Sequence, residues 1–239
     1  MPTYCCAHRG APDTHPENTT PSFLAALELG VDMIEFDVRV TADGHAVLMH
    51  DQTVDRTTNG TGAVEELTLA QIKQLDAGSW KDPGFAGTEV PTFAETLQIM
   101  PPNVLLNIEL KAGAQVVDLV IAQLKKMAMI GQSLLAARND QAVRARELAP
   151  GMKIINFSRQ DGGDGYIDNT IETGAEYIQL PRQHTTAERV ARCHDHGIGV
   201  NVFKSDEPDD QRLLMDWGVD YILTDTPRVL MQTLGRLEG

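Results

Sequence analysis

Short apolar runs alternate with amphipathic segments along almost the whole chain, a pattern typical of alternating strands and helices. The predicted strands cover 3–8, 33–39, 104–110, 133–137, 152–156, 176–180, 198–203 and 219–223. The predicted helices lie near 20–29, 92–99, 115–129, 139–148, 165–173, 185–196, 208–216 and 226–237. Thr20-Pro21 predicts a helix cap followed by the first helical residue, and Gly30 stands where that helix should end.

Eight strand–helix units in series predict an α/β fold and favour a closed TIM-type (β/α)8 barrel over an open doubly wound sheet. No glycine-rich turn of the form GxGxxG follows any of the runs, although an open nucleotide-binding sheet would need one. We therefore expect residues 1–239 to form a single barrel domain.

Residues 51–91 interrupt the alternation and are too long for a simple connection between two elements. They contain a turn-rich stretch at 57–60 and a short helical pattern near 68–75. We interpret them as a small insertion over the C-terminal rim of the barrel.

Polar residues repeatedly appear where a buried strand should end. They are His8, Arg9, Glu35, Asp37, His50, Glu109 and Lys111. Side chains alternate along a strand with period two, so Glu35 and Asp37 share one face. In a barrel the carboxyl ends of the strands form the rim where active sites are built. Because ionised groups at buried strand ends are costly unless paired, this pattern predicts a metal site that handles an anionic substrate.

Each part of this constellation also has a purely structural interpretation. Glu35, Asp37 and Glu109 offer the all-oxygen ligands that suit Mg²⁺ or Ca²⁺, but a buried salt-bridge network with Arg9, Arg39 or Lys111 is the alternative. His8 and His50 suit a general acid/base pair, whereas a lone histidine at such a place is more often a hydrogen-bonded core residue. Arg9 and Lys111 suit phosphoryl oxygens, and their alternative role is charge balance for the carboxylates.

Composition excludes several classes of function. The chain has 239 residues and a net charge of −14, which argues against binding nucleic acid or a basic membrane-surface face. No apolar stretch approaches the ~20 residues of a membrane helix, so we expect no stable membrane insertion. The first residues do not resemble a signal peptide and the three cysteines form no disulfide framework, so we expect a cytoplasmic protein. The oligomeric state stays open, a homo-oligomer included.

A series of motifs in this order resembles the glycerophosphodiester phosphodiesterases. They are His8-Arg9-Gly10, Pro16-Glu17-Asn18-Thr19, Glu35-Phe36-Asp37-Val38, Thr41-x-Asp43-Gly44, His50-Asp51, Asp55-Arg56-Thr57-Thr58-Asn59-Gly60, Leu75-Asp76-Ala77-Gly78, Glu109-Leu110-Lys111, Gly218-Val219-Asp220 and Thr224-Asp225-Thr226-Pro227. The resemblance covers essentially the whole chain. It implies a TIM-type barrel with a rim insertion that splits small-molecule glycerophosphodiesters into glycerol 3-phosphate and an alcohol.

The resemblance also implies roles for individual residues. Positions matching Glu35, Asp37 and Glu109 would hold a divalent cation, Mg²⁺ or Ca²⁺. Those matching His8 and His50 would be the acid/base pair, with their order and the nucleophile, water or a substrate hydroxyl, left open. Arg9 and Lys111 would contact phosphate.

The second half of the chain departs from the family pattern. Ala136-Ala137-Arg138 stands where relatives often have Ser-Phe, and Phe203-Lys204 where many have Trp-Thr, so the head-group alcohol is open. Arg138, Arg159 and Lys204 would add positive charge to the rim. Three other functions compete. They are a lysophospholipase D-like phosphodiesterase with apolar loops around Trp80 and Phe85, a metal-dependent sugar isomerase, and a non-catalytic phosphodiester-binding barrel.

Overall fold

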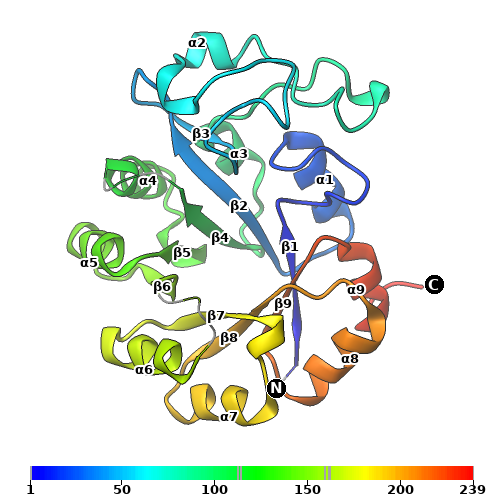
Figure 1. The fold of residues 1–239 in the computed structure, drawn as a ribbon, viewed down its shortest axis with the longest axis vertical. Helices are drawn as coiled ribbons and strands as arrows, with labels where there is room; N and C mark the ends of the chain where they lie inside the picture. Colours follow the sequence, from blue (N-terminus) through cyan, green and yellow to red (C-terminus); the bar gives the residue numbers. More distant parts are fainter. Residues whose placement is uncertain (1, 112, 114, 159, 161–162, 239) are drawn as a thin grey trace.

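Strand pairing closes the sheet of this chain into a barrel. The computed structural model describes residues 2–111, 113, 115–158, 160 and 163–238. Within them, eight parallel strands follow the order β1-β9-β8-β7-β6-β5-β4-β2, and β2 pairs with β1 to complete the ring (Figure 1). These strands are β1 (Tyr4–His8), β2 (Met33–Val40), β4 (Leu105–Leu110), β5 (Ser133–Ala137), β6 (Lys153–Asn156), β7 (Tyr177–Pro181), β8 (Gly199–Phe203) and β9 (Tyr221–Thr224).

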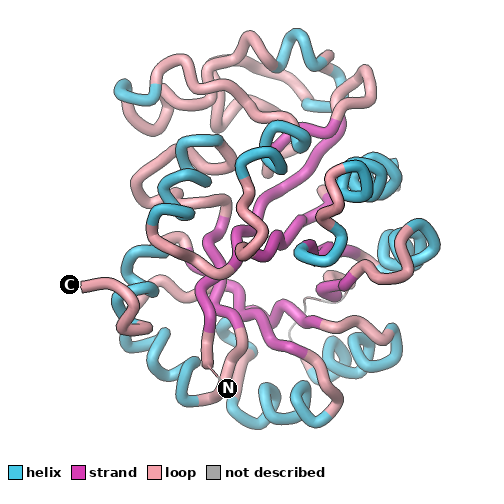
Figure 2. Tube along the Cα trace, turned by 180° about the vertical axis from the view of Figure 1, so that it is seen from behind, coloured by secondary structure: helices cyan, strands magenta, loops and turns pink. Residues whose placement is uncertain are grey.

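Helices cover the outside of the barrel, as Figure 2 shows from the opposite side. They are α1 (Thr20–Glu28), α3 (Phe93–Ile99), α4 (Gln115–Lys126), α5 (Asn139–Leu148), α6 (Asp164–Thr173), α7 (Ala187–Asp195), α8 (Pro208–Asp216) and α9 (Pro227–Thr233). Outward-facing strand residues such as Phe36 and Ile108 pack against helix residues such as Phe23 and Ile121 in one large apolar cluster. A smaller cluster that includes Cys6, Met33 and Leu223 lies apart from it. The predicted (β/α)8 barrel is confirmed.

A short ninth strand lies outside the eight predicted strand ranges, although His50 was expected at the end of a buried run just after it. β3 (Ala46–Leu48) pairs antiparallel with β2 outside the ring, with Val38 opposite Leu48 and Val40 opposite Ala46. The end of β2 therefore extends beyond the rim of the barrel, and the antiparallel strand β3 returns the chain toward the rim. The predicted cap of α1 was wrong by one residue: Thr19, which has an extended backbone, is the cap residue, and Thr20 is already helical.

The stretch between β3 and α3 contains two short 3₁₀ turns, η1 (Val64–Glu66) and η2 (Pro83–Phe85), and one short helix, α2 (Leu69–Ile72). It lies beyond the outer end of β2, at the top of Figure 1. Val54, Val64 and Ile72 pack with Val47 and Val90 in an apolar cluster of their own. This stretch is the insertion; its boundaries of 51–91 stay a prediction.

Further 3₁₀ turns are η3 (Ile130–Gln132) and η4 (Arg182–His184). Cys5, Cys6 and Cys193 are buried free thiols. In the part of the chain that the structure describes, no helix combines the length and the apolar character that crossing a membrane requires. Arg159, one of the three cations expected at the rim, lies outside the described residues.

Candidate active site

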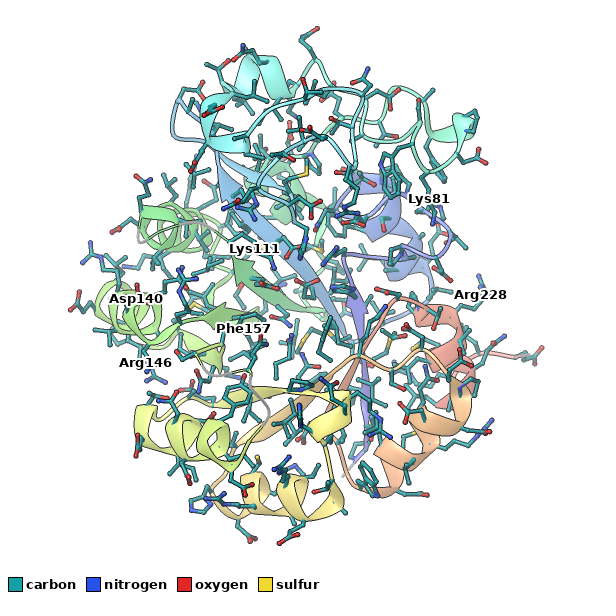
Figure 3. All side chains as sticks on the ribbon, in the orientation of Figure 1. Lys81, Lys111, Asp140, Arg146, Phe157 and Arg228 are labelled. Atoms are coloured by element: carbon teal, nitrogen blue, oxygen red, sulfur yellow. The ribbon has the colours of Figure 1, made fainter. Side chains whose placement is uncertain are left out.

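Strand register brings the predicted polar residues together at one end of the barrel. His8 of β1 pairs with Glu35 of β2, and Asp37 of β2 pairs with Glu109 of β4. One carboxylate oxygen from each of Glu35, Asp37 and Glu109 lies within 4.8 Å of the other two. Lys111 follows β4 directly, and Figure 3 shows it close to the ends of β2 and β4.

The three carboxylates converge in a largely buried place. Glu35 and Asp37 are only 2% and 0% exposed, respectively. Among the described residues, Glu35 Oε1 and Asp37 Oδ1 have no hydrogen-bond partner. Burial and the charges of Asp37 and Glu109 raise the pKa of Glu35 well above its usual value, and burial and Asp37 raise the pKa of Glu109. Unsatisfied buried oxygens that converge on one point fit a hard divalent cation.

Two cations reach the same carboxylates. Arg9 Nε lies 3.1 Å from Asp37 Oδ2, and Lys111 Nζ lies 3.3 Å from Asp37 Oδ1 and forms an ion pair with Glu109. Burial alone would lower the pKa of each cation, but the charge of Asp37 and the other carboxylates raises both pKa values, so both side chains are charged.

The alternative of a salt-bridge network is therefore realised in part. Arg39 does not belong to it, because its guanidinium donates to the carbonyl oxygens of His50 and Lys111. Glu35, Asp37 and Glu109 are three carboxylates, whereas Arg9 and Lys111 are two cations. The cations are therefore one fewer than the carboxylates.

The loop between β1 and α1 folds back onto the carboxylates. Arg9 and Asn18 both have a φ of +55°, and Gly10 has a φ of +95° with no room for a Cβ beside Ser22. The Arg9 amide donates to Glu35 Oε2 at 3.1 Å, and Asn18 Nδ2 donates to Asp37 Oδ2 at 2.8 Å. The loop thereby fixes the orientation of two carboxylates, while one oxygen of each has no hydrogen-bond partner in the described part of the chain.

His8 is oriented by a carboxylate from the last strand connection. Its Nδ1 lies 2.5 Å from Asp225 Oδ1, while its Nε2 lies 3.8 Å from Glu35 Oε2. An ionised carboxylate only accepts hydrogen bonds, so Nδ1 donates and Nε2 is directed toward the cluster. Burial, followed by the charge of Arg9, lowers the pKa of His8 to about 4, which leaves the ring neutral at pH 7.

His50 reaches the rim by a route that differs from the prediction. We expected it to end a buried strand of the barrel, but it follows the antiparallel strand β3. The Met49 amide donates to the Asp37 carbonyl oxygen, which brings His50 level with the cluster. His50 Nδ1 lies 2.6 Å from Asp51 Oδ1, and burial lowers the pKa of the ring.

Sequence reasoning from the strand ends missed the partners that hold these side chains. They are Glu17, Asn18, Asp51 and Asp225. Asp225 directly follows β9, so the strand-end signal that identified Glu109 was present there as well. For Glu17 and Asn18 no such signal exists, because they lie in a loop that only the fold brings to β2.

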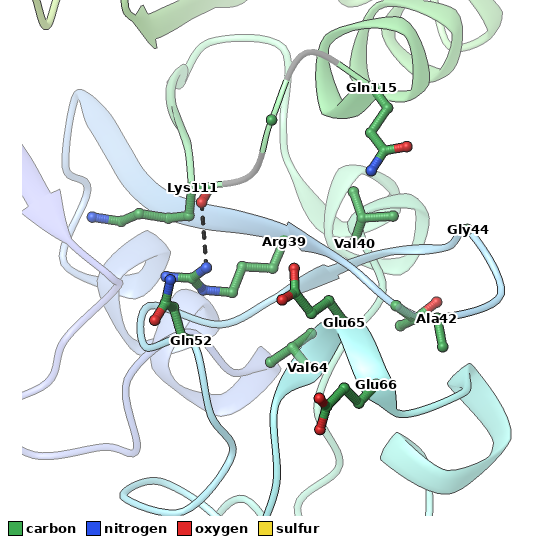
Figure 4. A pocket seen from close by; sticks show the side chains of 12 residues that line it. Arg39, Val40, Ala42, Gly44, Gln52, Val64, Glu65, Glu66, Lys111 and Gln115 are labelled. Atoms are coloured by element: carbon green, nitrogen blue, oxygen red, sulfur yellow. Dashed lines mark hydrogen bonds between the residues drawn. The ribbon is translucent and has the colours of Figure 1, made fainter.

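A cavity of about 600 Å³ lies beside the site, between β2, η1 and the start of α4 (Figure 4). Its lining includes Arg39, Gln52, Glu65 and Lys111 but none of the three carboxylates or the two histidines. It is therefore a neighbouring space and not the ion site itself.

Comparison with known proteins gives one consistent answer. The sequence matches the Glycerophosphoryl diester phosphodiesterase family over residues 8–229. It is 35% identical over 237 residues to the glycerophosphodiester phosphodiesterase of Caldanaerobacter subterraneus subsp. tengcongensis, which covers 97% of each chain. A glycerophosphodiester phosphodiesterase structure from Agrobacterium tumefaciens has a TM-score of 0.85 at 29% identity, over 96% of this chain and 99% of that one. An Oleispira antarctica phosphodiesterase, solved with its product sn-glycerol-3-phosphate, shares the fold with a TM-score of 0.89 at 24% identity, over 98% and 97%.

Proposed function

The chain belongs to the glycerophosphoryl diester phosphodiesterase family and is an enzyme of that activity, and we propose that a divalent cation and two histidines carry out its reaction. The reaction hydrolyses a glycerophosphodiester to glycerol 3-phosphate and an alcohol. One observation carries the proposal: three carboxylates, two histidines and two cations from four separate segments meet at one mouth of the barrel.

Glu35, Asp37 and Glu109 are the residues that would hold the cation, and their all-oxygen donor set favours Mg²⁺ or Ca²⁺. When bound, such an ion supplies a Lewis acid that polarises a phosphoryl oxygen and orients the substrate. Two oxygens support this assignment: Glu35 Oε1 has no hydrogen-bond partner among the described residues, and Asp37 Oδ1 has an ion-pair contact with Lys111 but no hydrogen bond.

Arg9 and Lys111 are positioned to bind the phosphate. Both carry a full positive charge at the edge of the carboxylate cluster, and their present partners include Asp37. The Arg9 guanidinium offers a planar fork to two phosphoryl oxygens, whereas Lys111 offers a compact charge. As negative charge grows on the phosphoryl group, these fixed cations stabilise it without rearrangement.

His8 and His50 transfer the protons. One takes the proton of the nucleophile, which is water or the vicinal hydroxyl of the substrate, and the other protonates the leaving alkoxide. Asp225 and Asp51 accept from the two Nδ1 atoms, so each ring presents Nε2 to the substrate. Each transfer is worth roughly 10² to 10⁴ in rate.

The test is release of glycerol 3-phosphate from a panel of glycerophosphodiesters, with and without chelator. We expect activity on at least one member, loss of that activity on chelation, and recovery when Mg²⁺ or Ca²⁺ is restored. Undiminished activity after complete chelation would remove the cation from the mechanism, and an inert panel would remove the substrate class. In the same assay Asp37→Asn should abolish the activity, whereas its matched control Asp209→Asn, an exposed change on α8, should keep it.

The structure gives little support to a lipid substrate. Trp80 is 38% exposed but donates its indole N–H to Ala77, and Phe85 packs against the ring of His15. Trp80 and Phe85 are therefore each engaged in a different contact.

For location we infer the cytoplasm, which the three free thiols support because such thiols persist in a reducing compartment. Cell fractionation with an antibody to the protein tests this. Nucleic acid stays outside the expected partners because of the net charge of −14.

A further inference from the structure

Arg56 links two parts of the site that belong to distant segments of the chain. Its guanidinium makes four hydrogen bonds to two carboxylates. Nε and Nη2 donate to Asp51 at 2.7 and 3.1 Å, and Nη1 and Nη2 donate to Glu17 at 2.9 and 2.8 Å. Arg56 and Asp51 lie between β3 and η1, whereas Glu17 lies in the loop between β1 and α1.

Each of these carboxylates holds one residue of the proposed reaction. Asp51 Oδ1 accepts from His50 Nδ1 at 2.6 Å, and Glu17 Oε1 accepts from Arg9 Nη1 at 2.8 Å. A continuous series of contacts therefore runs from His50 through Asp51, Arg56 and Glu17 to Arg9.

The network keeps both carboxylates ionised. Hydrogen bonds from Arg56 are the largest influence on Asp51 and hold its pKa well below the usual range. Burial would raise the pKa of Glu17, but hydrogen bonds and charge from Arg56 and Arg9 lower it to about 2. An ionised Asp51 can only accept, so it fixes the proton of His50 on Nδ1.

We propose that Arg56 is a positioning residue, which holds His50 and Arg9 in their working orientation by clamping the insertion to the β1–α1 loop. The inference rests on the proposed roles of His50 and Arg9. Without Arg56, Asp51 and Glu17 are free to turn toward solvent and the ring of His50 loses its fixed tautomer.

A simple surface salt bridge is the competing explanation. The Arg56 side chain is 45% exposed, and exposed ion pairs contribute little to stability. The chain contains a close match for this explanation in Arg144 of α5, whose side chain is 43% exposed and which also bridges two carboxylates, Asp118 and Glu147. Arg144→Ala therefore controls for the loss of an exposed arginine with two acidic partners.

The experiment compares Arg56→Ala, Arg56→Lys and Arg144→Ala. We expect Arg56→Ala to lower kcat by about 10- to 100-fold, because small misplacements of reacting groups have effects of this size. Arg56→Lys should restore only part of the rate, since a point charge does not reproduce the four-bond fork. Arg144→Ala should keep kcat and KM within about twofold, and the thermal midpoints of the two alanine variants should fall by similar small amounts.

A second readout needs no substrate. Nitrogen-15 NMR of the histidine side chains, assigned with His50→Gln, should show His50 protonated at Nδ1 in the wild type and a mixture of tautomers in Arg56→Ala. An unchanged His50 signal together with an unchanged kcat in Arg56→Ala would overturn the proposal, as would equal losses of kcat in Arg56→Ala and Arg144→Ala. A wild-type protein that cleaves no glycerophosphodiester would overturn the proposed function instead, and the NMR comparison would still decide the role of Arg56.

Discussion

Replacement of Glu35 by Gln should stabilise the ion-free protein, and added ion should no longer raise the stability of the variant. The ligand oxygens of Glu35, Asp37 and Glu109 lie within 4.8 Å of one another. With an effective dielectric constant of about 20, two negative charges at that distance repel by about 3 kcal/mol. Attraction to Arg9 and Lys111 offsets much of this repulsion.

We therefore expect Glu35→Gln to stabilise the chelated protein by about 1–2 kcal/mol, which raises the melting temperature of a protein of this size by about 2–8 °C. The amide oxygen of the substituted side chain can still accept from the Arg9 amide, so the fold loses no required contact. The wild type should gain about 3 kcal/mol at an ion concentration 100 times Kd, whereas the variant should gain almost nothing.

The assay is a thermal melt of both proteins in chelator and in a series of Ca²⁺ and Mg²⁺ concentrations. Glu172→Gln, an exposed change on α6, is the control and should follow the wild type throughout. A variant that is less stable than the wild type in chelator would refute the repulsion argument. Equal stabilisation of both proteins by the ion would show that Glu35 is not a ligand.

Three further outcomes follow from the same structure. With a nitrophenyl leaving group, which needs no proton, the His8→Gln or His50→Gln variant that has lost the general acid should recover most of its activity; no recovery in either would contradict the acid/base pair. The pKa of Glu17 is about 2 in the folded protein against an ordinary 4.5. Its contribution to the free energy of unfolding is therefore complete above about pH 4.5 and is lost as the pH falls toward 2. At 1.36 kcal/mol per pKa unit, the difference between 4.5 and about 2 is worth at most about 3.4 kcal/mol. Urea melts of Glu17→Gln should therefore show a flatter pH dependence in that window. Burial raises the pKa of the Cys193 thiol to about 11, so a disulfide reagent at pH 8 should label the native protein far more slowly than the unfolded one.

The sequence pattern was sufficient for the barrel because the barrel strands carry short, mostly apolar runs that alternate with amphipathic helical segments. The same pattern brought Glu35, Asp37 and Glu109 together, since strand period and parallel register leave little freedom in where strand-end side chains point. It failed for β3, because three residues are too few to show a period and the antiparallel return depends on pairing with β2.

The contacts that orient the site residues could not be predicted from the hydrophobic pattern, for a different reason. Glu17 and Arg56 are 39 residues apart in the sequence and lie in different loops. Glu17 contacts Arg9 and Arg56 only because these two loops fold over the same strand ends. Such contacts depend on the three-dimensional path of loops, which hydrophobic periodicity does not describe. Asp225 was accessible to the strand-end argument, because it directly follows β9, and it accepts a hydrogen bond from His8.

The most direct test of the central claim is an anomalous difference map from crystals grown with Mn²⁺, which accepts the same oxygen ligands as Mg²⁺ and Ca²⁺. The account predicts one strong peak bound by Glu35, Asp37 and Glu109, with His8 and His50 facing it. A peak elsewhere, or none at saturating Mn²⁺, would contradict the claim that these three carboxylates exist to hold an ion.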